Sequence, residues 1–185
     1  MRKIAWLLIL MICFVSVSQS YAKNLYAKFR GVDPIAIYVD KIDNSSGDKA
    51  VTTEKVKSVF KDIVEERKEV KFKVVSDIKD ADVVIDIDVK EYEFTDKAGV
   101  RLTGGMWGVV GDTAEPKNMC IVKATYVVRD PKTGNIITRE NNVFAEARKP
   151  RETFKQDQTT HEAIEKNVET FLVKVFYQPK KRPQL

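Results

Sequence analysis

The sequence contains very little cysteine and histidine. Among its 185 residues there are two cysteines and one histidine. Cys13 lies in the first apolar run, so removal of that run leaves Cys120 alone and excludes an internal disulfide. A catalytic thiol would need a histidine partner, and His161 is far from Cys120 in sequence. We therefore expect Cys120 to be a buried structural residue and His161 to lie on the surface, in the first turn of a helix.

The apolar run at residues 4–17 is too short to span a membrane, which takes about 20 apolar residues. Two basic residues precede the run, and the small residues Ser20 and Ala22 follow it. This order is typical of a secretory signal peptide. We expect residues 1–22 to be the signal peptide, with cleavage after Ala22 or Ser20; the alternative is an uncleaved anchor.

The chain has no extended block of like charges before its last residues. It has 32 basic and 27 acidic residues, a net charge of +5, and the two signs alternate along the sequence. The one basic cluster, at 180–182, lies between prolines in residues 179–185, which we predict to be a disordered tail. Intermixed charges and export argue against a nucleic-acid partner. Residues 23–178 have the length and composition of one soluble domain.

Glycine is scarce except in one segment. Four of the eight glycines lie in TGGMWGVVGD, residues 103–112. A Walker-type phosphate loop ends in Gly-Lys-Ser/Thr, and no lysine follows Gly111. A dinucleotide-binding loop joins a strand to a helix, whereas this segment lies between two predicted strands. The pattern therefore fits neither kind of phosphate loop.

The same glycine-rich segment belongs to a connection of roughly 20 residues, and connections of that length are usually functional or disordered. Met106, Trp107, Val109 and Val110 supply apolar contact area there. Tryptophan and methionine are common at protein interfaces. We expect these four residues to bind a partner or a membrane; the alternative is that Trp107 folds back over the edge of its own sheet.

Alternating apolar and polar residues predict five strands. The predicted strands span residues 34–40, 72–75, 82–92, 120–129 and 136–147. The clearest one has an apolar face and a charged face. The apolar face consists of Val83, Ile85, Ile87 and Val89, and the charged face of Asp82, Asp86, Asp88 and Lys90. A later strand places Cys120, Val122, Ala124, Tyr126 and Val128 inward and Lys123, Thr125 and Arg129 outward.

Apolar residues spaced three and four apart predict two amphipathic helices. The first begins at Thr52 or Thr53 and ends near Arg67; the second begins near Thr159, where TTHE fits a capping box, and ends before Pro179. The order of elements is β-α-β-β-β-β-α, with a parallel first pair and an antiparallel meander of the last three strands. We predict an α+β two-layer sandwich with a mixed, mostly antiparallel sheet and both helices on one face.

Asp86 and Asp88 place two carboxylates about 7 Å apart on one strand face. Such a pair could hold a divalent cation or serve as an acid and a base. No third ligand or histidine is near in sequence, so we favour a solvated face with lysines and arginines of neighbouring strands as partners. The sequence thus predicts no catalytic residue, no metal site and no cofactor.

Several stretches resemble a recurring type of bacterial envelope protein. They are PIAIYVDKIDN with the helix after it, ADVVIDIDVKEYEF, and ATYVVRDPKTGNIITREN. Over most of residues 33–178 the chain is similar to the lipopolysaccharide-assembly lipoprotein family (LptE), and to small domains of the curli-secretion lipoprotein, the penicillin-binding-protein activator and the TolB amino terminus. The resemblance implies the α+β fold and, for the LptE family, a domain that plugs a β-barrel and helps deliver lipopolysaccharide. Unlike those lipoproteins, this chain has no small residue just before Cys13.

The main hypothesis is a non-enzymatic periplasmic protein that acts as an LptE-like assembly or accessory factor at the outer membrane. Its partner would be an outer-membrane protein or a glycolipid, with peripheral membrane association. For a glycolipid, Lys90, Lys123 and Arg139 would meet the anionic headgroup. The competing hypothesis is a soluble periplasmic metal-binding protein or hydrolase that uses Asp86 and Asp88.

Overall fold

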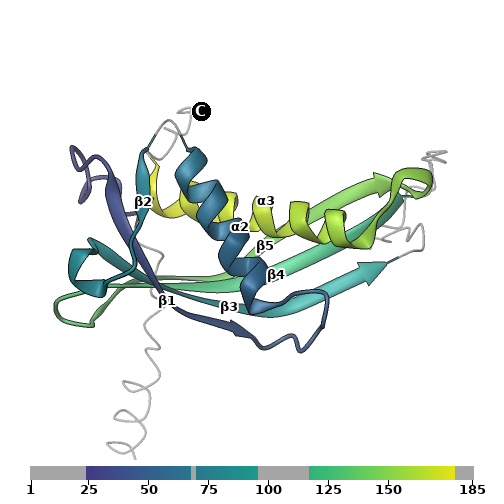
Figure 1. The fold of residues 1–185 in the computed structure, drawn as a ribbon, viewed down its shortest axis with the longest axis horizontal. Helices are drawn as coiled ribbons and strands as arrows, with labels where there is room; N and C mark the ends of the chain where they lie inside the picture. Colours follow the sequence, from purple (N-terminus) through teal and green to yellow (C-terminus); the bar gives the residue numbers. More distant parts are fainter. Residues whose placement is uncertain (1–23, 68–69, 96–116, 178–185) are drawn as a thin grey trace, which may run out of the picture.

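The computed structural model describes residues 24–67, 70–95 and 117–177 (Figure 1). The elements in chain order are β1 (Ile35–Asn44), α2 (Thr53–Glu66), β2 (Phe72–Val74), the 3-10 turn η1 (Ile78–Asp80), β3 (Val83–Thr95), β4 (Lys117–Arg129), β5 (Ile136–Pro150), the 3-10 turn η2 (Arg151–Thr153) and α3 (Gln156–Phe176). Within these ranges, no helix is long and apolar enough to cross a membrane. The predicted signal peptide and the predicted tail lie outside the described residues.

The five strands form one mixed sheet in the order β2-β1-β3-β4-β5. β1 pairs in parallel with β2 and with β3, whereas β3 with β4 and β4 with β5 are antiparallel. The helices α2 and α3 lie on the same side of this sheet (Figure 1). The fold is therefore an α+β two-layer sandwich, and the predicted order of elements, parallel first pair and final meander are confirmed.

The alternating apolar residues place the core between the sheet and the helices. The four inward positions predicted for β3 and the five predicted for β4 are all at most 2% exposed. Burial of a large apolar side chain stabilises the fold by about 1.5–3 kcal/mol. Cys120 is free and buried, as predicted. His161 lies on the surface, as predicted, but in the second turn of α3 and not the first. Its Nε2 is 3.3 Å from a carboxylate oxygen of Glu165.

Helix α2 follows its sequence pattern. Thr52 is the N-cap, and its hydroxyl accepts a hydrogen bond from the Lys55 N–H at 3.2 Å. The buried residues recur at helical spacing: Val56, Val59, Phe60 and Val64. The last turn contains Glu65 and Glu66 but no basic residue. The negative end of the helix dipole therefore has no compensating charge in its own turn.

Helix α3 begins at Gln156 rather than near Thr159, so the predicted capping box is wrong. The N-cap position is Lys155, whose side chain makes no capping hydrogen bond. Thr159 and Thr160 are fully buried inside the helix, and the Thr160 hydroxyl lies 2.8 Å from the hydroxyl of Tyr92 in β3. Contact with the sheet thus holds this turn in the helix, against the local preference of threonine for a helix start.

Three strands continue beyond their predicted ends, to Asn44 in β1, Thr95 in β3 and Pro150 in β5. The long strands also contain irregular pairings, at Val39/Lys41, Val89/Glu91, Ala124/Tyr126 and Val128/Arg129. The third lies opposite Asn142, whose φ is 55°. The continuations are rich in polar residues, so hydrophobic alternation gives little signal there.

The first described residues bind to the end of α3. The Asn24 side-chain amide donates to the carbonyls of Lys174 and Tyr177 at 2.8 and 2.9 Å, and the Leu25 N–H donates to the Val175 carbonyl at 2.6 Å. Carbonyls at a helix C-terminus have no partner within the helix. Leu25 itself is buried in the core. No pattern in the sequence predicts this contact.

Candidate binding surfaces

The outer face of the sheet, on the side away from both helices, carries alternating charges. We define it by the outward residues of the four long strands: Tyr38, Lys41 and Asp43 in β1; Val84, Asp86, Asp88, Lys90, Glu91 and Glu93 in β3; Met119, Ile121, Lys123, Thr125, Val127 and Arg129 in β4; Ile136, Arg139, Phe144, Glu146 and Arg148 in β5. The strand register brings opposite charges within reach of one another across neighbouring strands.

Arg129 joins two carboxylates on this face. Its Nε and Nη2 donate to the two oxygens of Asp86 at 2.8 and 2.7 Å, and Nη2 also donates to Asp40 at 2.5 Å. The hydrogen bonds to Asp86, and then to Asp40, raise the pKa of Arg129 above its ordinary value. The guanidinium therefore holds a charge-assisted bridge between β1, β3 and β4.

Four more ion pairs cover the rest of the face. They are Lys90–Asp88, Lys123–Glu91, Lys41–Asp43 at 2.8 Å and Arg148–Glu146 at 2.7 Å. Burial by itself would raise the pKa of Asp88, but hydrogen bonds from Lys90 and Ser45 lower it below its ordinary value. Exposed pairs contribute at most about 1 kcal/mol each. These pairs therefore add little to the stability of the fold.

Asp86 and Asp88 lie on the outer face, as predicted, and basic side chains hold both of them. Arg129 comes from the neighbouring strand, as expected, and Lys90 comes from the same strand. Within the described ranges, no three His, Cys, Asp or Glu side chains come together in a way that could hold a metal ion. A cation at Asp86 would have to displace a guanidinium that occupies both carboxylate oxygens.

The predicted headgroup ligands Lys90, Lys123 and Arg139 differ in their surroundings. Lys90 and Lys123 already pair with carboxylates, so a lipid phosphate would have to compete for them. Arg139 lies opposite Val127 and forms no ion pair with any described residue. Headgroup binding by these three residues stays a prediction.

Apolar side chains on the outer face were not singled out from the sequence. Val84 is 1% exposed and Ile121 is 4% exposed, although both lie on the side away from the helices. Ile121 has Glu93 and Glu146 as its cross-strand neighbours. Phe144, opposite Lys123, is 37% exposed. Strand alternation predicts outward side chains at these positions, and an apolar residue among outward charged ones is the signal that could have revealed them.

The predicted contact residues Met106, Trp107, Val109 and Val110 lie outside the described residues. The two strands that their segment connects pair as far as Thr95 and Met119. Their role in binding stays a prediction.

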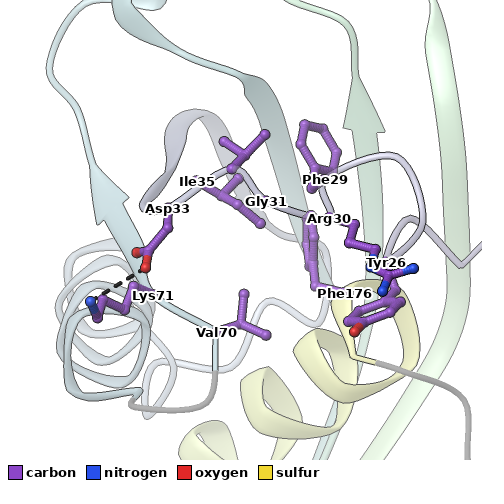
Figure 2. Close-up of a pocket in the computed structure, with 10 residues that line it drawn as sticks. Tyr26, Phe29, Arg30, Gly31, Asp33, Ile35, Val70, Lys71 and Phe176 are labelled. Atoms are coloured by element: carbon purple, nitrogen blue, oxygen red, sulfur yellow. Dashed lines mark ion pairs between the residues drawn. The ribbon is translucent and has the colours of Figure 1, made fainter.

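A cavity of about 260 Å³ opens at the end of the sheet where β1 begins. Its lining includes the buried Phe29, Ile35 and Phe176 and the more polar Tyr26, Arg30, Asp33 and Lys71. Figure 2 shows Asp33 and Lys71 facing each other at one side of the cavity, in an ion pair of 3.3 Å. Small-molecule sites usually enclose about 300–1,000 Å³. This cavity suits a single side chain better than a cofactor.

A groove of about 690 Å³ adjoins the cavity, between the last turn of α2 and the strand β2. Its lining consists of Asp33, Pro34, Glu65, Glu66, Arg67, Lys71, Phe72 and Lys73. Arg67 pairs with Glu169 of α3, whereas Glu65 and Glu66 pair with no described residue. Sequence reasoning missed this groove. No local pattern signals it, because its lining comes from three separate stretches of the chain.

Comparison with known proteins finds similar structures but no similar sequence. No protein-family model matches the chain, and no curated protein sequence matches it significantly. The PelC dodecamer from Paraburkholderia phytofirmans is 11% identical over 84% of this chain and 95% of that chain, with a TM-score of 0.47. The hypothetical protein CT253 from Chlamydia trachomatis is 6% identical over 76% and 96%, with a TM-score of 0.44.

Lipoproteins of other bacteria are also among the similar structures. The lipoprotein GNA1162 from Neisseria meningitidis is 16% identical over 66% of this chain and 88% of that chain, with a TM-score of 0.37. A minor lipoprotein from Acinetobacter baumannii matches as well. Identities and TM-scores this low carry no conclusion about the activity or partners of this chain, and membership of the LptE family stays a prediction.

Proposed function

We propose that this protein is an exported, non-enzymatic binding domain of the bacterial envelope, which serves an outer-membrane partner as an assembly or accessory factor. The secretory signal predicted for residues 1–22 supports export. The observation that carries the proposal is the outer face of the sheet. Both helices lie on the other side (Figure 1), and the outer face presents paired charges around Ile121 and Phe144.

A protein partner fits this surface better than a lipid. Exposed ion pairs are weak, so a docking protein can exchange one partner for another at little cost in free energy. Alternating signs then select one register and orientation of the partner. An anionic glycolipid carries charge of one sign, so binding to Lys90 and Lys123 would leave Asp88 and Glu91 without their partners.

Apolar side chains would supply contact area among the charged residues of the outer face. Phe144 is the exposed aromatic residue of the outer face, and aromatic anchors dominate many interfaces. Met106, Trp107, Val109 and Val110 would add a second apolar contact from the connection between β3 and β4. We propose that the two contacts serve the same partner.

Site-specific crosslinking in cells tests the outer face. A photo-crosslinking amino acid replaces Phe144 on the outer face or, as the matched control, Val173, which is 50% exposed on α3. We expect position 144 to capture one defined outer-membrane protein and position 173 to capture none. Adding Trp107→Ala should reduce the capture at position 144 severalfold.

Three results would count against the proposal. Equal capture at positions 144 and 173, or none at either, would remove the outer face as the binding surface. Crosslinking to a glycolipid at position 144 would replace the protein partner by a lipid. Heat release on titration with calcium, magnesium or manganese that disappears on Asp86→Asn with Asp88→Asn would favour the metal-binding alternative.

A further inference from the structure

Strand β5 forms one edge of the sheet. It spans 15 residues and, among the described strands, pairs only with β4. This pairing is regular from Val143 to Pro150. Backbone groups alternate in direction along a strand, so about half of those between Phe144 and Lys149 point away from β4. In the part of the chain that the structure describes, no group outside β4 forms a hydrogen bond with the backbone of this segment.

The features that usually protect a strand edge lie outside this segment or point elsewhere. Edge strands are commonly protected by proline, by lysine or by a bulge. Pro150 follows the segment, and the irregular pairing at Asn142 precedes it. Lys149 is its one lysine, and its ammonium group pairs with Glu162 of α3 at 2.6 Å. The backbone edge is therefore open to another strand.

The side chains of the segment restrict how a second copy of it can pair. Two identical antiparallel strands pair about a two-fold axis, and opposite residues point to the same face of the sheet. The axis must therefore pass through a residue and not between two residues. An axis at Glu146 or at Arg148 would place like charges opposite each other. An axis at Ala147 places Glu146 of each copy opposite Arg148 of the other, on the outer face.

We infer that two copies of this protein form a dimer by antiparallel pairing of their β5 edges about a two-fold axis at Ala147. Main-chain hydrogen bonds supply affinity in edge pairing, and the two Glu146–Arg148 contacts between copies set the register. Within one copy, Arg148 lies 2.7 Å from Glu146. Because this pair is exposed to solvent, each residue can exchange its partner at little cost in free energy.

The dimer joins two sheets into one, with the helices of both copies on the same side. The outer faces of the two copies then form one continuous surface that contains two Phe144 side chains. The inference goes beyond the proposed function and does not depend on it, because the copies pair through the strand edge and leave the outer face free. A partner that contacts both copies at once gains apparent affinity from the double contact.

Sedimentation of the purified protein tests the dimer and its register through charge reversal. Glu146→Arg and Arg148→Glu each place like charges across the axis, and each should weaken the dimer about tenfold or more. A mixture of the two variants should form a heterodimer, because every charge across the axis then faces an opposite one. Each variant lacks its internal Glu146–Arg148 pair, so contacts within one copy cannot produce this heterodimer.

Glu93→Arg is the matched control, because it makes the same charge change on the outer face of β3, away from the edge. It should leave dimerisation unchanged. Circular dichroism and thermal unfolding confirm that each variant is folded.

Amide hydrogen exchange locates the contact between the copies. Every second N–H between Phe144 and Lys149 should exchange severalfold more slowly in the dimer than at high dilution. The inference is overturned by a parent protein that stays monomeric up to about 1 mM, by a dimer that both charge reversals leave intact, or by a mixture that stays monomeric. Slower exchange at Phe72 and Val74 of β2, in place of β5, would also overturn it. None of these outcomes depends on capture of an envelope partner, so the inference and the proposed function fail separately.

Discussion

Asn167 connects α3 to two strands through buried hydrogen bonds. Its Nδ2 donates to the carbonyls of Val122 and Val143 at 3.1 and 2.7 Å, and its Oδ1 accepts from the Tyr126 hydroxyl at 2.8 Å. The Tyr126 ring stacks on Phe171 of the same helix, with ring centroids 4.0 Å apart. Burial raises the pKa of Tyr126, so its hydroxyl remains a donor. These directional bonds fix the rotation of α3 over the sheet more tightly than apolar contacts alone would.

Glu140 is a second buried polar residue on the helix side of the sheet. It lies opposite Tyr126 in the β4–β5 register and is 7% exposed. Burial raises the pKa of Glu140, and the charge of Lys174 on α3 partly opposes this. The folded protein therefore tolerates the protonated carboxyl better than the ionised one.

We predict that Glu140→Gln stabilises the protein at neutral pH and leaves it unchanged in acid. Because the pKa is higher in the folded chain than in the unfolded chain, the folded state binds more protons between the two values, and the parent protein loses stability as pH rises through them. The variant should gain stability as pH rises above the ordinary pKa of glutamate, about 4.3, and gain nothing in more acidic solution. Denaturant unfolding across this pH range measures the gain.

Glu93→Gln, which removes an exposed carboxylate from β3, serves as the control and should change stability by less than about 0.5 kcal/mol. A gain for Glu140→Gln that is the same at every pH would contradict the assignment of the effect to ionisation of Glu140.

At the scale of elements, the two helices differ in how they begin. The α2 N-cap, Thr52, accepts a hydrogen bond from the backbone, whereas the α3 N-cap position is occupied by Lys155, which cannot accept one. Helix α3 begins there because its first turns are buried against the sheet, as the complete burial of Thr159 and Thr160 indicates. One start is determined locally and the other by tertiary packing.

This difference predicts opposite effects of substitution at the two caps. Thr52→Ala should lower the free energy of unfolding by about 1 kcal/mol, because a backbone donor of α2 loses its acceptor. Lys155→Asp should raise it by about 0.5–1 kcal/mol, because α3 gains an acceptor and a negative charge at its N-terminus. Urea unfolding compares both variants with Lys155→Ala, which removes the lysine without adding an acceptor and should gain less than Lys155→Asp.

At the scale of the whole molecule, the first and last described residues meet at the end of α3. Asn24 and Tyr177 are joined by a hydrogen bond of 2.9 Å, and Leu25 is buried beside them in the core. Cleavage after Ala22, as predicted, leaves both Asn24 and Leu25 in the exported chain. The lining of the cavity includes Tyr26, Phe29 and Phe176, so its shape depends on this contact.

We therefore predict that Leu25→Ala destabilises the whole domain, by about 2–4 kcal/mol, as is typical when a buried leucine is truncated. Thermal and denaturant unfolding measure the loss. Val32→Ala, at a residue of the same segment that is 39% exposed, is the control and should change stability by less than about 0.5 kcal/mol. A small effect of Leu25→Ala would show that this segment is an appendage and not part of the fold.

The candidate surfaces were predictable only in part. The outward direction of Asp86, Asp88, Lys123 and Arg129 follows from strand alternation, since successive side chains point to opposite faces. The bridge from Arg129 to Asp40 does not follow, because it depends on the register of three strands and on the irregular pairing beside Asp40. No local sequence pattern predicts the groove either, because it is assembled from residues around positions 33, 66 and 72.

The sequence by itself determined the five strands, the two helices, their order and the residues that face the core. Those features depend on periods of two and about 3.6 residues, which are local and can be recognised along the chain. Only the tertiary structure decided where α3 begins, that Asn24 and Leu25 bind its end, which carboxylates Arg129 joins, and that Glu65 and Glu66 line one groove with Phe72 and Lys73. Each of these depends on the energy of contacts between residues distant in sequence, and such contacts produce no periodic pattern in the sequence.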